Sequence, residues 1–266
     1  MASLRVLVEE ASEKTPPPWW VSPCLCLVAC TNLIRTPFIN FFGRRKWNRI
    51  KRSPATARLH LGCGKKGKYF RNFLNCDLTP HKDVDLILDC GRLDFFEDQS
   101  VSLIYSHAFF EHLFLQQHEI FLAECYRTLR ADGVVITLGT PDFAAVAKEY
   151  LNKSDLSSER QFDLKMAYWQ THGAPESNAL DWISQLHKAL FDRDYLLGLY
   201  CKTGFGEVRI FNYHYKDEFT AHNLGVIAAR EQIADSTWPI LSEFAQQFLG
   251  PNATAQRIVN EYVWKK

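Results

Sequence analysis

The fold is decided by residues 58–64, which read RLHLGCG. Arg58–Leu61 predicts a short, mostly apolar strand, and Gly62 and Gly64 predict a tight turn, because glycine accepts the backbone angles that such turns require. A strand that ends in a glycine turn is typical of a parallel α/β sheet, in which ligands bind at the carboxyl ends of the strands. The segment therefore predicts both a fold class and the edge of the sheet where a site is expected.

Four further apolar segments follow this strand at the spacing of an alternating α/β chain. Residues 111–129, between the last two of them, carry apolar side chains at helical spacing and predict a helix. Strands separated by helices or crossovers favour a parallel sheet with both faces covered. The expected strands are Asn72–Leu78, Val84–Leu88, Val101–Ser106 and Val134–Leu138.

The glycine turn fits two classes of cofactor, and its spacing separates them. Residues 62–67 match the G-x-G-x-x-G pattern of dinucleotide-binding proteins, in which a helix N-terminus holds a pyrophosphate. Here Asp77 follows Gly67 by only 10 residues, and the second strand must fit between them. No room is left for a crossover helix, which argues against a nicotinamide or flavin cofactor.

S-adenosylmethionine (SAM) carries no phosphate, so its binding does not require a helix N-terminus after the glycine turn. Gly62 and Gly64 allow its methionine part to approach the backbone closely. Asp77, at the end of the second strand, is placed to accept both ribose hydroxyls, and Asp89, one strand on, can accept from the adenine amino group. A glycine turn followed by these two acids in order therefore favours SAM.

Four stretches of the chain carry a family resemblance. They read LHLGCG (residues 59–64), NCDL (75–78), VSLIYSHAFFEHL (101–113) and ECYRTLRADG (124–133). They resemble the class I SAM-dependent methyltransferases, and within them the small-molecule, methyltransferase type 11-like group. With later similarities the resemblance covers residues 58–230.

The resemblance implies a Rossmann-like α/β fold: a mostly parallel seven-stranded sheet with helices on both faces and a C-terminal antiparallel hairpin of residues 207–213 and 223–229. It implies methyl transfer from SAM to a small-molecule or glycan-type acceptor, with oxygen as the expected methyl acceptor. The alternative is a catalytically inactive SAM-fold scaffold or a membrane-peripheral binding protein. The implied cofactor-binding residues are Gly62, Cys63, Gly64, Asp77, Leu78, Asp89, Cys90 and Ser106.

Methyl transfer from a sulfonium needs mainly alignment of the acceptor, and a general base helps where the acceptor is a hydroxyl. His107 and His112 are the candidate bases, with Glu111 as a candidate partner that orients them. In the alternative interpretation, Glu111 interacts with the helix dipole and His112 is an ordinary packed histidine.

Residues 143–200 are expected to form a helical insertion, either as a lid that lines an acceptor pocket or as a cap with an aromatic core. Residues 231–266 are expected to form a helical extension of two amphipathic helices, which cap the sheet or carry a dimer contact. The candidate acceptor residues are Thr140, Asp142, Trp169, His172 and His187.

Residues 1–57 form an N-terminal arm that is first apolar and then basic. The apolar run is interrupted by proline and polar residues and is too short to cross a bilayer. One interpretation is peripheral membrane contact through residues 19–52. The other is a helix that packs on the body and is followed by a solvated basic linker.

The formal net charge of +1 hides an asymmetry, because residues 1–66 carry 12 Lys and Arg against 3 Asp and Glu, which leaves 19 against 27 for residues 67–266. The acidic body argues against nucleic acid as a partner. The eight cysteines include no C-x-x-C pair and no zinc-like spacing, so no metal site is expected. They are interpreted as reduced thiols of a cytoplasmic protein.

Overall fold

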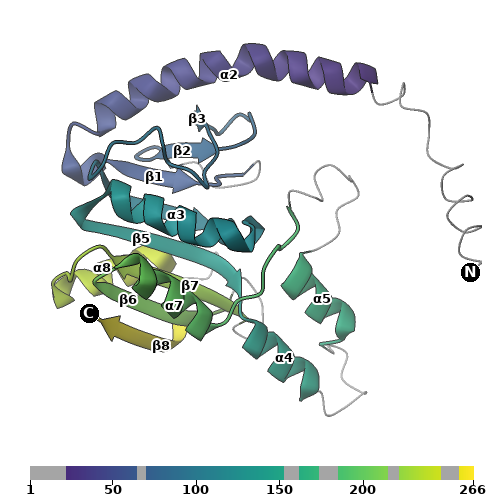
Figure 1. Cartoon of the computed structure of the whole chain (residues 1–266), viewed down its shortest axis with the longest axis vertical. Helices are drawn as coiled ribbons and strands as arrows, with labels where there is room; N and C mark the ends of the chain where they lie inside the picture. The colour runs from purple at the N-terminus through teal and green to yellow at the C-terminus, as the bar shows by residue number, and fades with distance from the viewer. Residues whose placement is uncertain (1–21, 65–69, 153–161, 174–184, 215–221, 247–257) are drawn as a thin grey trace, which may run out of the picture.

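The computed structural model describes residues 22–64, 70–152, 162–173, 185–214, 222–246 and 258–266. Its centre is an eight-stranded sheet with the strand order β3-β2-β1-β4-β5-β7-β6-β8 (Figure 1). The strands are β1 (Arg58–Leu61), β2 (Leu74–Asp77), β3 (Leu86–Ile87), β4 (Val101–His107), β5 (Leu129–Pro141), β6 (Glu207–Tyr213), β7 (Asn223–Ala229) and β8 (Ile258–Lys265).

The strands from β3 to β5 in this order are parallel to one another, whereas β7, β6 and β8 run antiparallel to their neighbours. This confirms the mostly parallel sheet with an antiparallel hairpin, which β6 and β7 form with the expected bounds. The sheet has one strand more than the seven expected, because β8 pairs with β6 from beyond the hairpin.

The C-terminal residues 231–266 are only partly helical. Helix α8 (Trp238–Gln246) follows the short helix η4 (Asp235–Thr237). For residues 258–265 the expectation of a helix is wrong, because they form β8, and residues 247–257 lie outside the described residues. Trp264 of β8 lies opposite Val208 of β6 and packs against the main core. Valine, isoleucine, tyrosine and tryptophan suit a strand, and the outer side of β6 supplies the backbone partner.

The central strands point alternate side chains into two cores, one on each face of the sheet. Ile104 of β4 lies in the larger core, which α3 (Leu115–Thr128) and α7 (Arg193–Thr203) cover. The next residue, Tyr105, lies in the smaller core together with Trp238 of α8. Helices therefore cover both faces, as expected.

The connections among β1, β2 and β3 are short, and no helix forms in the described part of the β1–β2 connection, residues 62–64 and 70–73. The long helix α2 (Ser22–Ile50), which precedes β1, packs against β2 and β3 (Figure 1). Trp47 of α2 is buried, with its ring 5.0 Å from that of Phe96, which follows β3 in the chain.

Two polar contacts also join α2 to the strands. Lys46 Nζ lies 2.6 Å from Asp85 Oδ2, and the side-chain amide of Asn40 makes two hydrogen bonds with the backbone of Ile87, of 2.7 and 3.1 Å. The C-terminal part of α2, from Asn40 to Trp47, thus packs on the body, and the basic residues 44–49 belong to the helix rather than to a linker. Among the described helices, none combines the length and apolar character that a membrane crossing requires.

Two further helices, α4 (Phe143–Leu151) and α5 (Leu164–His172), lie beyond the end of β5 (Figure 1). They form part of the expected insertion 143–200, of which other parts lie outside the described residues. The end of that range belongs to α7, whose Leu196 and Tyr200 are fully buried in the main core. This end therefore covers the sheet and is not part of a lid.

His60 of β1 is a buried neutral histidine between the first two strands. It is 4% exposed, its Nδ1 lies 3.1 Å from Asn75 Oδ1, and its ring packs against Phe70 and Tyr105. Burial lowers the pKa of His60 to about 4, although the hydrogen bond with Asn75 acts in the opposite direction.

We expect the free energy of unfolding to fall as the pH drops from about 6.5 towards 4, because the unfolded chain binds a proton at His60 that the folded chain excludes. The loss for this one group is up to about 1.4 kcal/mol per pH unit. Urea unfolding between about pH 7 and pH 5 measures it. Burial also lowers the pKa of His118, to about 4, so the comparison that isolates His60 is wild type against His60→Gln. The variant should lose less stability over this range, and equal slopes would contradict the prediction.

Candidate functional site

The turn after β1 is left-handed at both glycines, with φ of 64° at Gly62 and 63° at Gly64. A Cβ atom at Gly62 would lie 2.5 Å from the ring of Phe109. Position 62 therefore requires glycine both for its backbone angle and for this contact. Residues 65–67, the rest of the expected glycine pattern, lie outside the described residues.

Asp77, the last residue of β2, joins this turn to the second strand. Its Oδ2 accepts a hydrogen bond of 2.8 Å from the amide of Gly64, and its Oδ1 accepts two of 2.9 Å from the amide and hydroxyl of Thr79. A carboxylate can accept about four hydrogen bonds, two on each oxygen. These three bonds therefore leave one acceptor position, on Oδ2. Both hydroxyls of a ribose would fit only if Thr79 released Oδ1.

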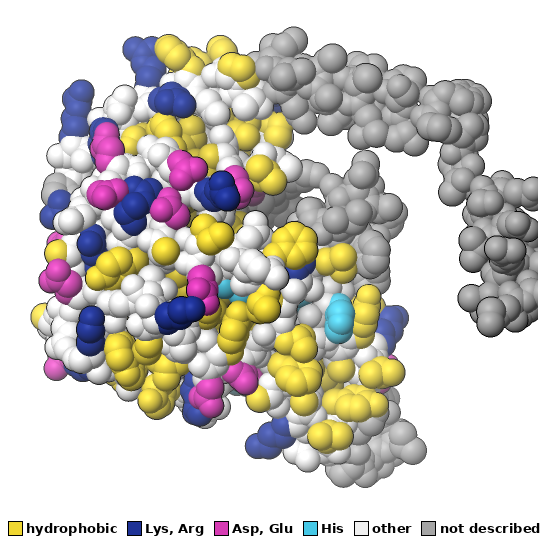
Figure 2. Space-filling model, in the orientation of Figure 1, with side chains coloured by type: hydrophobic (Ala, Val, Ile, Leu, Met, Phe, Trp, Pro, Cys, Tyr) yellow, Lys and Arg dark blue, Asp and Glu magenta, His cyan; other side chains and the backbone are white. Residues whose placement is uncertain are grey.

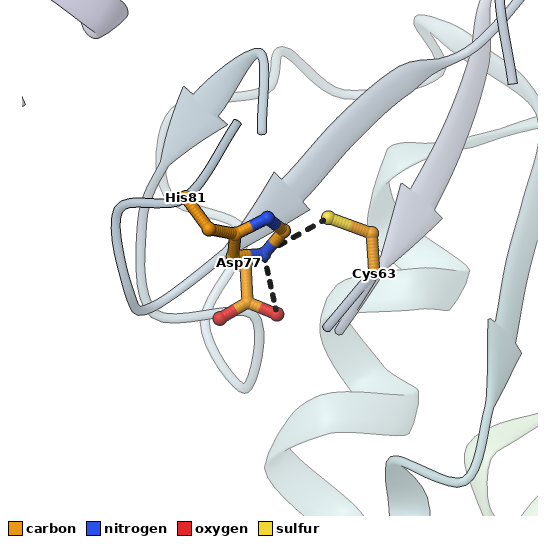
Figure 3. A group of neighbouring side chains, drawn as sticks. All are labelled: Cys63, Asp77 and His81. Carbon is orange, nitrogen blue, oxygen red and sulfur yellow. Dashed lines mark hydrogen bonds and ion pairs between the residues drawn. The ribbon is translucent and has the colours of Figure 1, made fainter. Parts of the chain in front are cut away.

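Figure 3 shows that Cys63 and His81 lie beside Asp77. His81 Nε2 is 3.9 Å from both Asp77 Oδ2 and Cys63 Sγ. Burial, with a contribution from Asp77, raises the pKa of the Cys63 thiol to about 12. Cys63 is therefore a protonated thiol that fills the turn, which fits packing better than nucleophilic catalysis.

The segment after β3 reaches the same edge of the sheet. Cys90 is buried, which raises the pKa of its thiol, and its sulfur interacts with the backbone amide of Gly62. Asp89 is exposed, and its Oδ1 accepts a hydrogen bond of 2.9 Å from the amide of Gly91. Leu78, next to Asp77, is 66% exposed and offers an apolar surface there.

The end of β4 lies next to the glycine turn. Ser106, opposite Leu61 in the sheet register, is fully buried, and its hydroxyl has no hydrogen-bond partner among the described residues. Ala108 has a φ of 49°, which is uncommon for a residue with a side chain. The chain can take this conformation at Ala108 because residue 139 of β5 is a glycine. A Cβ atom at position 139 would lie only 2.5 Å from the Ala108 nitrogen. This turn leads into the short helix η3 (Phe110–His112).

The structure does not bring the two candidate bases together. His107 lies beside Tyr105, with Nδ1 at 3.3 Å from the tyrosine hydroxyl. His112 belongs to η3, and its Nδ1 lies 3.1 Å from the carbonyl oxygen of Leu186. The two rings therefore have different partners.

Glu111, His112 and His187 come together instead, with potential ligand atoms that all lie within 4.8 Å of one another. Glu111 is 2% exposed, and its Oε2 has no hydrogen-bond partner among the described residues. Burial raises the pKa of Glu111 to about 8 and lowers that of His187 to about 4. Sequence spacing did not predict this group, because His187 is far from the other two along the chain.

Two expected acceptor residues lie at the end of β5. Thr140 is fully buried, and its hydroxyl has no hydrogen-bond partner among the described residues. Asp142 begins α4: its Oδ1 accepts from the amide of Ala144 at 3.0 Å, and its Oδ2 accepts from the Asn212 side-chain amide at 2.8 Å. Both carboxylate oxygens of Asp142 are thus used to hold the structure together.

The other expected acceptor residues lie on or beside α5. Trp169 is half-buried under Lys165, His172 is exposed and stacks on Tyr168 at 4.9 Å, and His187 Nδ1 lies 3.1 Å from the carbonyl oxygen of Gln170. Figure 2 shows hydrophobic side chains over α4 and α5. The exposed large hydrophobic residues of these helices are Phe143, Leu151, Leu164, Met166 and Tyr168.

Sequence reasoning missed three residues of this region. Phe109 closes over Gly62, Thr79 bonds to Asp77, and the amine of Lys188 donates to the carbonyl of His112 at 2.8 Å. Of these three, only Thr79 could have been predicted from the sequence, because a threonine two residues after an aspartate commonly forms a hydrogen bond with its side chain. Together the edge offers an approachable backbone turn, carboxylates and buried polar atoms, which suit a small polar ligand.

Comparison with known families gives one match: residues 59–137 match the family described as a methyltransferase domain. The match runs from β1 into β5 and so includes the glycine turn, Asp77, Asp89 and the residues at the end of β4. A comparison with curated proteins finds no match.

Several solved structures are similar, all weakly. A SAM-dependent methyltransferase from Thermotoga maritima, described as a possible histamine N-methyltransferase, has a TM-score of 0.43 and 13% identity over 76% of this chain and 96% of that one. One from Archaeoglobus fulgidus has a TM-score of 0.43 and 12% identity over 70% and 93%. Phosphoethanolamine N-methyltransferase 2 of Haemonchus contortus has a TM-score of 0.42 and 12% identity over 66% and 48%. Likeness at this level carries no argument about function.

The assignment therefore rests on the family match and on the site that lies within it. The match confirms the resemblance and the expected cofactor, SAM. Nothing found favours the alternative of an inactive scaffold. Residues 59–137 of this chain match the methyltransferase domain family, and this match supports SAM-dependent methyl transfer as the activity of the chain.

Proposed function

We propose that the enzyme transfers the methyl group of SAM to an oxygen of a small-molecule or glycan-type acceptor. In this proposal the cofactor lies at the carboxyl edge of β1, β2 and β4. The residues proposed to bind it are Gly62, Cys63, Gly64, Asp77, Leu78, Asp89, Cys90 and Ser106.

The observation that carries the cofactor part is the hydrogen bond from the Gly64 amide to Asp77. One bond holds the turn and the carboxylate together, so a ligand that touches both meets a preformed site. The methionine part of SAM would approach the backbone at Gly62, and the ribose would bond to Asp77 and replace Thr79. The exposed Leu78 would pack against the adenine.

The acceptor part rests on the polar groups beyond β4. The sulfonium of SAM is already activated, so the chain has to align the acceptor about 3 Å from the methyl group and exclude water. We assign the general base to His107, because His112 lies with Glu111 and His187. The proposed acceptor contacts are Thr140, Trp169, His172 and His187; Asp142 is left out because both its oxygens are bonded.

Replacing Asp77 by alanine is expected to weaken SAM binding about 10- to 100-fold, because hydrogen bonds to a charged group contribute about 1.5–3 kcal/mol. Calorimetric titration of SAM and S-adenosylhomocysteine into the full chain measures this. The matched control is Asp94→Ala, which removes an exposed aspartate outside the proposed site. Wild-type affinity in a folded Asp77→Ala protein, or no SAM binding by the folded wild type, would overturn the cofactor part.

With SAM labelled in its methyl group, we expect transfer to hydroxyl compounds and not to matched amines. His107→Asn should lower kcat about 100-fold, because a positioned base contributes roughly 10²–10⁴. Its affinity for SAM should stay unchanged. Exclusive methylation of amines would refute the oxygen assignment, and an unchanged kcat in the variant would refute the role of His107.

A second proposal, peripheral membrane contact, is supported by α2. Phe38, Phe41 and Phe42 are 67%, 52% and 51% exposed, and at helical spacing they lie opposite the buried Trp47. The guanidinium of Arg45 lies over the ring of Phe41 at 5.3 Å, whereas that of Arg44 lies over the ring of Phe95 at 4.8 Å. Figure 2 shows hydrophobic and basic side chains together in the described part of this helix. Aromatic rings next to arginines suit an anionic lipid surface.

The triple variant Phe38→Ser, Phe41→Ser, Phe42→Ser should bind anionic vesicles at least about 10-fold more weakly, since each buried Phe contributes about 1.5–3 kcal/mol. Cosedimentation with phosphatidylcholine vesicles, with and without phosphatidylserine, measures the binding. Phe114→Ser, which removes another exposed phenylalanine, is the control and should bind as the wild type does. Equal binding by all three proteins, or none by the wild type, would exclude this contact surface.

A further inference from the structure

Glu111, His112 and His187 form a compact group of two imidazoles and one carboxylate beside the proposed cofactor site. Glu111 and His112 come from η3, directly after β4, and His187 comes from the segment that follows α5. His112 Nε2 lies 3.9 Å from Glu111 Oε1, and the two imidazole rings are 5.3 Å apart. All three potential ligand atoms lie within 4.8 Å of one another.

The hydrogen bonds of both histidines fix which ring nitrogen carries the proton. His112 Nδ1 pairs with the carbonyl of Leu186, and His187 Nδ1 pairs with the carbonyl of Gln170, each at 3.1 Å. A carbonyl oxygen only accepts, so Nδ1 is the donor in both rings. Each neutral ring then has a lone pair on Nε2. Histidines that bind metals are held in this way, by a hydrogen bond from the other ring nitrogen.

Glu111 brings an acidic group to the same place, and one of its two carboxyl oxygens lacks a hydrogen-bond partner among the residues described. Its Oε2 is buried without a hydrogen bond in the described part of the chain, and the distance of 3.9 Å from Oε1 to His112 Nε2 is too long for one. The nearby amine of Lys188 donates to the carbonyl of His112. When the Glu111 carboxyl is ionised, it and the two Nε2 lone pairs are three acceptors without a donor between them, and a cation would satisfy all three.

We propose that Glu111, His112 and His187 bind a divalent transition-metal ion of the zinc class. Two histidines and one glutamate are a known ligand set for Zn²⁺, which keeps a further position for a water or a substrate oxygen. Bonds of about 2.0–2.2 Å need inward shifts of the side chains by under about 1 Å. Contact of the metal with the acceptor hydroxyl rests on the proposed function, whereas metal binding itself does not.

The second group with suitable geometry, Cys63, Asp77 and His81, fits a metal less well. Asp77 already accepts hydrogen bonds from Gly64 and Thr79, and the Cys63 thiol is buried next to that carboxylate. A metal there would need the thiolate and would compete with these bonds. This group therefore supplies the control.

The test is a titration of the metal-free full-length chain with Co²⁺, followed by visible absorption, with SAM affinity measured on the same samples. We expect one Co²⁺ per chain without a sulfur-to-metal charge-transfer band. Glu111→Gln and His187→Gln should each weaken Co²⁺ binding at least about 10- to 100-fold. The control His81→Gln should bind Co²⁺ as the wild type does, and circular dichroism shows that each variant is folded.

No saturable Co²⁺ binding by the folded wild type would overturn the proposal. Unchanged binding in folded Glu111→Gln, or lost binding in His81→Gln, would also overturn it. Asp77→Ala separates the two proposals, because it should weaken SAM binding as predicted above and leave Co²⁺ binding unchanged. A wild type that binds Co²⁺ but not SAM would refute the proposed function alone.

Discussion

The short connection between β1 and β2 is the constraint on which the rest of the structure depends. Parallel strands need a crossover of about a dozen residues or more, usually with a helix, and residues 62–73 only just provide that length. Two consequences follow. The chain must turn sharply at Gly62, which brings the Gly64 amide to Asp77. Phe70 and Phe73 of the connection then pack in the smaller core without a described helix, while Trp47 of α2 packs in the larger core on the other face.

Among the described residues, several polar groups at the carboxyl edge of the sheet are buried without a hydrogen bond that would stabilise the fold. Ser106, Glu111 and Thr140 are buried, and each has a side-chain oxygen without a partner in the described part of the chain. Such atoms cost about 1–3 kcal/mol each. They gather where β4 and β5 end, next to the backbone angle of Ala108, and strain of this kind clusters at functional sites.

Local patterns predicted most of the fold and only part of the site. β1, β6 and β7 have the predicted bounds, and Asp77 is where the second strand ends. β8 could not be read locally, because its strand form depends on the partner β6. The nearness of His187 to Glu111 likewise arises only through tertiary packing. For Asp142 the sequence suggested a substrate contact, whereas an aspartate before a helix also serves as its N-cap, as the structure shows.

The two edge strands of the sheet determine whether copies of this protein can pair with one another through their sheets. Exposed strand edges invite pairing between chains, which leads to aggregation. At one edge, the amide of Asn40 bonds to both the nitrogen and the oxygen of Ile87 and so takes the place of a neighbouring strand. At the other edge, β8 has a left-handed residue at Asn260, with a φ of 52°, beside the charged Glu261. A strand from another copy therefore meets a first edge that is already hydrogen-bonded and a second edge that is irregular and charged. Both features disfavour edge-to-edge strand pairing between folded chains.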